Sequence, residues 1–568
     1  MMRHSVISSN PTSSTRRPRW LDAAPLVVML MCGFVSAFSS NAAESLDPLI
    51  TEERLAEFAR MVDALRQELL IPGLSAAIVH DNDLVWAQGF GLSDVERGIE
   101  AAANTPYGLA SLTKPFSAIL LMRMVEQGHL DLDVRIQKFG VSLGHPAITV
   151  RHVLSHTSAG TPGSAFDYDG NRYSKLTTVI EQLHGDTLRN VMRHEILAPL
   201  EMNSTVLNCG SCGVDFFLSR LEPAAWEHAF ANVWRSAATP YQYDADYTLH
   251  EGPAPSHTNA AAGLVSTVED LARLVVALDQ DVLLRAETSD VMFTATELNS
   301  GESAPYGLGW FVETAWDTRL IWHYGYGMFS SLLLIVPDEN LALIVLANTQ
   351  NLSRPFDLGH ADTSVLTSPV ALAFFKTFVL GPRLAEPLPV IDWTATRDTV
   401  IDQLDRITDP NLCALFRSEL WSYRKLYAAV GRLDVSDNLY SVYSQAFPGV
   451  RRTQQEAALA DPPDTRIVLD RSEITDQERT RWIGSYHVRA EDAGSGLPSD
   501  LVIREVDTGI GLWFGTDECQ LMVIEDAMTL GFDSNPGLAL EASEGNAPFS
   551  SLTLTYDGHP LILYERVE

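Results

Sequence analysis

The 568-residue sequence predicts an α+β fold, in which helices pack against an antiparallel sheet, and three patterns support this prediction. A long apolar helix pattern covers residues 109–132, and two strand patterns precede it at 74–79 and 84–91. A run of further strands follows much later, at residues 306–313, 320–322, 329–336 and 341–347. Short turns such as Asp81-Asn82-Asp83 and Pro337-Asp338-Glu339-Asn340 separate neighbouring strands, which favours antiparallel pairing.

The first helix is predicted to begin at Thr51-Glu52-Glu53 and to end before Pro72-Gly73. Its apolar residues recur on one side: Leu55, Phe58, Ala59, Val62, Leu65 and Leu69. The helix in 109–132 differs, because apolar residues surround nearly its whole circumference, and such a helix is buried. Pro115 suits its first turn and Gly128 suits its end.

Two polar residues, Ser111 and Lys114, stand at the start of this apolar helix. A serine hydroxyl is a weak nucleophile unless a base removes its proton, and residues three apart share one helix face. Burial lowers the pKa of a lysine and lets it act as that base, while the helix N-terminus favours negative charge at the serine. This Ser-x-x-Lys spacing is typical of penicillin-recognising serine enzymes, although it arises by chance about once in a chain of this length.

Composition indicates a soluble chain of two or three globular domains, because 46% of the residues are hydrophobic. The formal net charge of −33 argues against nucleic acid and anionic membrane surfaces as partners. A small-molecule or peptide-like substrate is expected instead, with no metal and no cofactor.

Residues 1–43 are predicted to be a signal peptide. Arg16, Arg17 and Arg19 form a basic segment, residues 23–38 are apolar, and Ser40-Asn41-Ala42 offers a cleavage site. The expected location is therefore periplasmic or secreted, with an uncleaved anchor as the alternative and the export route open. After the signal no apolar run is long enough to span a membrane. The four cysteines that remain, Cys209, Cys212, Cys413 and Cys519, permit disulfides or free thiols.

Three stretches make the chain similar to the superfamily of serine hydrolases that resemble class C β-lactamases and penicillin-binding proteins. They are Ser111-x-x-Lys114, the segment Leu154-Ser-His-Thr-Ser-Ala-Gly160 and the helix ending Gly128-His-Leu-Asp-Leu-Asp133. The similarity covers roughly residues 46–380. It implies a β-lactamase/transpeptidase-like fold: an antiparallel sheet flanked by helices, beside a helical subdomain. Members include β-lactamases, D-alanyl-D-alanine carboxypeptidases, D-aminopeptidases and esterases. Within the second stretch His156 is interpreted as structural.

The resemblance implies further site residues, at which this sequence departs from the family pattern. Tyr168 takes the tyrosine position of the Tyr-x-Asn motif and relays protons, but Gly170 replaces the asparagine. The missing amide speaks against β-lactam or peptide binding, and Asn171 is the candidate to replace it. A plainer interpretation makes Tyr168 an ordinary loop aromatic.

His323-Tyr324-Gly325 corresponds to the Lys-Thr-Gly or His-x-Gly element of the superfamily. Gly325 is expected to let substrate approach the strand, and the N–H groups of Tyr326 and Ser111 to form the oxyanion hole. His323 is expected in the substrate site, although a lone histidine at a strand start is more often structural. An aromatic segment at 226–262 suggests either a lip over the site or a self-packed surface loop.

Beyond residue 380 the pattern changes. Residues 381–480 are predicted to be a linker and helical region after a hydrolase domain at 44–380. Helices are expected at 401–407 and 412–433, followed by a polar stretch to about residue 479. Residues 481–568 are predicted to form a small β-domain with short strands at 484–488, 501–506, 511–514, 521–524, 552–556 and 561–564. Trp482-Ile-Gly-Ser-Tyr486 resembles the entry to lipocalin-like domains.

The sequence thus predicts an exported serine hydrolase that forms an acyl-enzyme on Ser111 and cleaves ester or amide bonds, with esters preferred. The alternative function is non-catalytic binding of peptidoglycan fragments on the same fold.

Overall fold

The computed structural model describes residues 49–207, 232–244, 247–253, 258–359, 363–384, 387–407 and 409–446, together with eight strands between 484 and 567. The chain divides into two compact units, Met1–Pro448 and Gly449–Glu568. The predicted signal peptide, Cys209, Cys212 and the first part of the aromatic segment lie outside the described residues.

A seven-stranded antiparallel sheet forms the centre of the first unit, in the order β3-β2-β1-β12-β11-β10-β9. Its strands are β1 (Gly73–His80), β2 (Asp83–Asp94), β3 (Ile99–Glu100), β9 (Phe311–Ala315), β10 (Thr318–Tyr326), β11 (Ser330–Val336) and β12 (Leu341–Ala347). Five of the six predicted strands are present within a few residues. The exception is β9, which begins five residues later than predicted because Gly307 and Trp310 form a turn, with Gly309 at a φ of +87°.

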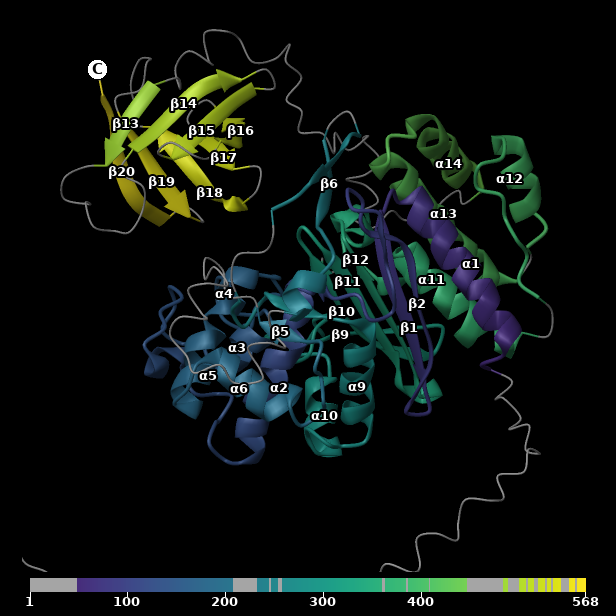
Figure 1. Cartoon of the computed structure of the whole chain (residues 1–568), viewed down its shortest axis with the longest axis horizontal. Helices are drawn as coiled ribbons and strands as arrows, with labels where there is room; N and C mark the ends of the chain where they lie inside the picture. The colour runs from purple at the N-terminus through teal and green to yellow at the C-terminus, as the bar shows by residue number, and fades with distance from the viewer. Residues whose placement is uncertain are drawn as a thin grey trace, which may run out of the picture. The chain divides into compact units, whose positions relative to one another are not determined.

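The sheet separates two hydrophobic cores, because successive residues of a buried strand point to opposite faces. Helices lie on both faces of the sheet (Figure 1). On strand β1, Ala77 and Val79 contribute to one core, while Leu74, Ala76 and Ile78 contribute to the other. The first core is covered by α2 (Lys114–Glu126), α5 (Leu176–His184), α6 (Leu188–Met192) and α9 (Val268–Asp279). The second core is covered by α1 (Glu52–Glu68), α11 (Pro369–Phe374), α13 (Pro410–Ala429) and α14 (Leu433–Ala446).

Shorter elements complete the unit. They are β4 (Tyr107–Gly108), α3 (Val150–Leu154), α4 (Gly170–Ser174), β5 (Val206–Leu207), β6 (Tyr241–Tyr243), β7 (Leu249–Glu251), β8 (Leu264–Ser266), α10 (Ala286–Met292) and α12 (Arg397–Leu404). Strands β4, β8 and β5 form a small sheet of their own, and its central strand leads into α9. The N-cap of α9 is Thr267, whose hydroxyl accepts from the Asp270 N–H.

The helices beyond residue 380 share the core of the sheet. Phe416 and Leu420 on α13 and Leu439 on α14 are fully buried, in the same core as Leu332 and Leu334 of β11. Removing these helices exposes apolar surface that the sheet face needs to bury. The boundary predicted at residue 380 remains a prediction; the division between compact units falls after Pro448.

The second unit contains eight antiparallel strands that close into a barrel. They are β13 (Gly484–Val488), β14 (Asp500–Val506), β15 (Gly509–Phe514), β16 (Cys519–Asp526), β17 (Thr529–Phe532), β18 (Asn535–Ala542), β19 (Ser551–Tyr556) and β20 (His559–Val567). Pairing of β13 with β20 closes the ring. Six of the strands correspond to sequence predictions; β17 and β18 were not predicted, because glycine and proline interrupt their alternation.

None of the helices in the described part of the chain combines the length and apolar character that crossing a bilayer requires.

Candidate active site

Ser111 lies in a single 3₁₀ turn, Ala110–Thr113, that leads directly into α2. The residue before it, Ala110, has a φ of +46°, a left-handed conformation that costs a non-glycine residue on the order of 1–3 kcal/mol. Both backbone groups of Leu109 are hydrogen-bonded: its N–H donates to the Leu264 carbonyl, and its carbonyl accepts from the Ser331 hydroxyl. The turn is therefore held in a strained shape by the sheet beneath it, and Ser111 stays partly exposed.

Lys114 has its side chain completely buried, and its Nζ lies 2.9 Å from the Ser111 Oγ. The Ala261 carbonyl oxygen is a second partner at 3.2 Å. Burial lowers the pKa of Lys114 to about 7, and the negative charge of Asp169 partly opposes this shift. A substantial fraction of Lys114 is therefore neutral near neutral pH, which lets it remove the proton of the serine that it contacts.

Tyr168 is the nearest aromatic neighbour of this pair. The Lys114 Nζ lies 4.8 Å from the centre of the Tyr168 ring, and the Tyr168 hydroxyl is buried without a hydrogen-bond partner among the described residues. Burial raises the pKa of Tyr168 well above 10, as does nearby Tyr324, while the neighbouring Ser111 hydroxyl acts in the opposite direction. Tyr168 is therefore a neutral phenol, able to donate a proton, and not a standing tyrosinate base.

His323, which is expected in the substrate site, has its ring centre 6.2 Å from that of Tyr168. The side chain is fully buried, and both ring nitrogens have partners: the Tyr306 hydroxyl at 3.0 Å from Nε2 and the Tyr324 carbonyl at 2.7 Å from Nδ1. A carbonyl only accepts, so Nδ1 carries the proton and Nε2 accepts from Tyr306. Burial lowers the pKa of His323 well below its usual value, and the charge of Lys114 lowers it further. His323 is thus a neutral packing residue, with no nitrogen left to hold a substrate.

Gly325 is also explained by packing. A Cβ at this position would lie 2.1 Å from the Leu109 carbonyl oxygen and 2.3 Å from the Ser331 Oγ, so only glycine lets β10 approach the turn of Ser111. The structure thus assigns the close approach at Gly325 to the chain itself, where substrate had been expected. Pairing of β10 with β9 ends at Trp322, and among the described strands none pairs with residues 323–326 on that side. Tyr326 lies at this open edge, and its role as an oxyanion donor stays a prediction.

The Tyr-x-Asn departure has a clear geometric consequence. Asn171 is exposed in the first turn of α4, and its N–H donates to the Asp169 carboxylate that caps the helix. At Gly170 an added Cβ would meet only the Lys114 Nζ, at 3.8 Å, which is an ordinary van der Waals distance. Position 170, where the family pattern has an asparagine, therefore lies next to Lys114 and has space for a Cβ.

Two residues in this site escaped the sequence prediction. Asp169 is the anionic neighbour of Lys114, although it lies far from it in the sequence. His156 had been interpreted as structural, yet its ring centre lies 4.3 Å from that of Tyr168. The only available signal was adjacency to Tyr168 for Asp169, and membership of a family segment for His156.

Comparison with known proteins identifies the family to which the chain belongs. The sequence profile of the Beta-lactamase family matches residues 58–365, which is more than half of the chain. The chain belongs to the β-lactamase family. It is 23% identical over 349 residues to Protein flp of Staphylococcus aureus (strain MW2), covering 56% of this chain and 68% of that protein. It is also 23% identical over 309 residues to Penicillin-binding protein 4* of Bacillus subtilis (strain 168), covering 47% of this chain and 66% of that protein.

Among solved structures, one similar chain is the octameric penicillin-binding protein homologue from Pyrococcus abyssi, with 17% identity and a TM-score of 0.46. The match covers 90% of this chain and all of that one. The protein is a serine hydrolase of the β-lactamase family, with an antiparallel sheet flanked by helices.

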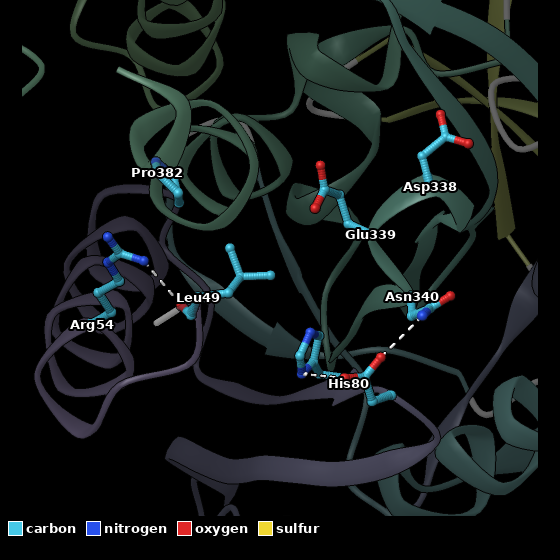
Figure 2. A pocket seen from close by; sticks show the side chains of 8 residues that line it. Leu49, Arg54, His80, Asp338, Glu339, Asn340 and Pro382 are labelled. Carbon is cyan, nitrogen blue, oxygen red and sulfur yellow. Dashed lines mark hydrogen bonds and ion pairs between the residues drawn. The ribbon is translucent and has the colours of Figure 1, made fainter. Parts of the chain in front are cut away.

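A cavity of about 430 Å³ lies at the end of the seven-stranded sheet that is opposite to Ser111 (Figure 2). It is lined by Leu49, Arg54, His80, Asp338, Asn340 and Pro382, among others, and Asn340 donates to Asp81 beside it. None of the predicted site residues lines it. In the described ranges no three His, Cys, Asp or Glu side chains are placed to share a metal ion.

Asp169→Asn is expected to move the acid limb of the pH–rate profile to lower pH. The neutral form of Lys114 is the base, so the rate rises as pH passes through its pKa of about 7. The Asp169 charge raises that pKa; its removal therefore lowers the midpoint, by roughly half a pH unit. Asparagine retains the helix-capping role of Asp169. The measurement is kcat/KM for 4-nitrophenyl butyrate across pH.

The matched control is Asp186→Asn, because Asp186 is an exposed aspartate that accepts from backbone N–H of Thr187 and lies outside the site. This variant keeps the wild-type midpoint. An unchanged or higher midpoint in Asp169→Asn would contradict the assignment of Lys114 as the base.

Proposed function

We propose that this protein is an exported serine hydrolase that forms an acyl-enzyme on Ser111 and prefers carboxylic esters. The observation that carries the proposal is the contact of 2.9 Å between the Ser111 Oγ and a fully buried lysine whose pKa is about 7. A lysine kept half neutral against a serine hydroxyl is the arrangement that nucleophilic catalysis needs.

The proposed reaction proceeds in two halves. In the first, the Lys114 amine takes the Ser111 proton while the serine oxygen bonds to the substrate carbonyl carbon. The N–H groups of Ser111 and Tyr326 stabilise the resulting oxyanion. The bond to the leaving group then breaks, the leaving oxygen takes a proton from Tyr168, and Lys114 returns its proton to Tyr168. In the second half, Lys114 takes a proton from water while the water oxygen bonds to the acyl carbon. The bond to the Ser111 oxygen then breaks, the serine takes the proton back from Lys114, and the acyl group leaves as a carboxylic acid.

Two features favour esters over β-lactams and peptides. Gly170 presents no side chain where the superfamily pattern has an amide that holds substrate amide groups, and Asn171, one position later, is exposed in the first turn of α4. His323 is neutral and internally bonded, so it offers no cation to a substrate carboxylate. A site lacking such contacts loses the substrates that depend on them.

The ester preference is tested by comparing kcat/KM for 4-nitrophenyl butyrate with that for a chromogenic cephalosporin and a D-amino-acid amide. We expect the ester to exceed both by at least about 100-fold, since each lost polar contact is worth a large factor. Gly170→Asn adds a side chain whose Cβ would lie at an ordinary van der Waals distance from the Lys114 Nζ, and it is expected to raise kcat/KM for the D-amino-acid amide relative to that for the ester.

The matched control is Gly128→Asn, at a helix end where an added Cβ meets nothing within 4 Å and where asparagine accepts a φ of +72°. It is expected to leave the substrate ratio unchanged. A wild type that prefers the cephalosporin would contradict the ester proposal.

Export and the role of the second unit complete the proposal. The basic and apolar composition of residues 1–43 supports a cleaved signal peptide and a periplasmic or secreted enzyme. The closed eight-stranded ring supports a lipocalin-like domain at 481–568. The other candidate, binding of peptidoglycan fragments without catalysis, gains no support from a serine that contacts a half-neutral base.

A further inference from the structure

His156 stands where a helix normally ends in glycine. It follows α3, with a φ of +54°, and its N–H donates to the Val153 carbonyl at 3.3 Å. The left-handed residue after a helix is usually glycine and sometimes asparagine, because a larger side chain adds strain there. A histidine at this position indicates that the side chain serves a purpose other than ending the helix.

The contacts of His156 enclose Tyr168. The N–H of Asp167 donates to the His156 carbonyl at 2.8 Å, and the N–H of Asp169 donates to the His156 Nδ1 at 3.1 Å. Both backbone N–H groups that flank Tyr168 are therefore fixed by one residue. The imidazole ring also lies against Tyr168, with ring centres 4.3 Å apart, and stacks on Tyr173 at 5.1 Å.

The protonation state of His156 suits this contact. Burial lowers the pKa of His156 well below its usual value, and the charge of Lys114 acts in the same direction. The ring is therefore neutral: Nδ1 accepts, and Nε2 carries the proton. The Nε2 group is buried without a hydrogen-bond partner among the described residues. Such an unsatisfied donor lowers the stability of the fold, and an apolar ring in the same place would avoid that loss.

We propose that His156 is a positioning residue that holds the Tyr168 hydroxyl where it protonates the departing group of the substrate. The inference rests on the proposed function, because it assigns a role in the same proton transfer. It differs from a structural role in a measurable way. A displaced Tyr168 impairs the reaction only to the extent that the leaving group needs a proton, whereas a loss of folded enzyme impairs all substrates equally.

The experiment compares two butyrate esters that share an acyl group. The 4-nitrophenolate ion leaves without a proton, whereas the alkoxide of ethyl butyrate needs one. Tyr168→Phe provides the reference, since it removes the donor itself. His156→Phe retains a ring but loses the acceptor for the Asp169 N–H. His156→Asn suits the left-handed backbone and offers an amide oxygen as acceptor.

We expect His156→Phe to lose about 100-fold in kcat/KM for ethyl butyrate and no more than about tenfold for 4-nitrophenyl butyrate. For each variant, kcat/KM for ethyl butyrate is divided by kcat/KM for 4-nitrophenyl butyrate to give a substrate ratio. The substrate ratio of His156→Asn should lie between that of His156→Phe and that of wild type. Ser155→Ala is the matched control: the Ser155 hydroxyl donates to the Arg151 carbonyl and lies 2.9 Å from the Thr157 hydroxyl, and among the described residues it has no hydrogen bond to Tyr168. Its substrate ratio should equal the wild-type ratio.

Equal losses on both esters in His156→Phe would overturn the inference while leaving the proposed function intact. If the phenylalanine variant does not fold, His156→Gly replaces it, since glycine adopts this backbone freely and carries no acceptor. The same unequal loss is then expected, and an unchanged ratio overturns the inference. A wild type that hydrolyses neither ester and does not react at Ser111 would contradict the proposed function and this inference together.

Discussion

Ser111→Ala is expected to abolish hydrolysis of every ester substrate, with a loss of three or more orders of magnitude in kcat. The reason is that no other hydroxyl is in contact with the Lys114 amine, among the contacts that the described residues make. Removing a nucleophile typically leaves only the residual rate from substrate binding and oxyanion stabilisation. Steady-state kinetics on 4-nitrophenyl butyrate measures the effect, with circular dichroism to verify folding.

Ser117→Ala provides a control on the same helix. The Ser117 hydroxyl is buried in α2 and has no hydrogen-bond partner among the described residues, so its removal leaves no group unsatisfied. This variant should retain wild-type kinetics. Turnover by Ser111→Ala at the rate of Ser117→Ala would exclude Ser111 as the nucleophile.

Lys114→Met is expected to reduce kcat by about 1,000-fold while raising the melting temperature. Methionine fills a similar volume but takes no proton, so the serine loses its base. The stability gain follows from linkage. The pKa of Lys114 falls from 10.5 to about 7 on folding, so burying the charged form costs stability, and this cost is fully present below pH 7.

The cost declines between pH 7 and about 10.5, because the folded protein then contains the neutral amine while the unfolded chain still binds the proton. The free energy of unfolding of Lys114→Met should therefore exceed that of wild type by on the order of a few kcal/mol at acid pH, and this difference should shrink at alkaline pH. Calorimetry at several pH values measures it. A variant that is both inactive and equally destabilised at all pH values would indicate a structural lysine.

The sequence was sufficient to predict Ser111 and Lys114 together, because three-residue spacing at a helix start determines their contact locally. The antiparallel strands were equally predictable, since alternation and turn residues mark them without reference to the rest of the fold. Strand β9 was shorter than predicted because aromatic residues at 306–310 occur both in strands and in buried turns. The helix α14 was missed because its polar residues conceal the apolar face that covers α13 and the sheet.

The rest of the site depends on tertiary contacts that spacing does not encode. Gly325 suggested an approach by substrate, but its missing Cβ accommodates the carbonyl of Leu109, which is distant in sequence. His323 matched a motif position, yet the Tyr306 hydroxyl that engages it comes from a separate turn. His156 becomes informative only when the loop containing Tyr168 is placed against it. Such relationships require three-dimensional coordinates.

The central claim, that Ser111 is an activated nucleophile, is tested most directly by mass spectrometry of the full-length protein after exposure to a fluorophosphonate probe. Wild type is expected to gain one adduct mass, and peptide mapping should locate it on the segment that contains Ser111. Ser111→Ala should gain none, and Lys114→Met should react far more slowly because the base is absent. An unmodified wild type, or an adduct on any residue other than Ser111, would contradict the account.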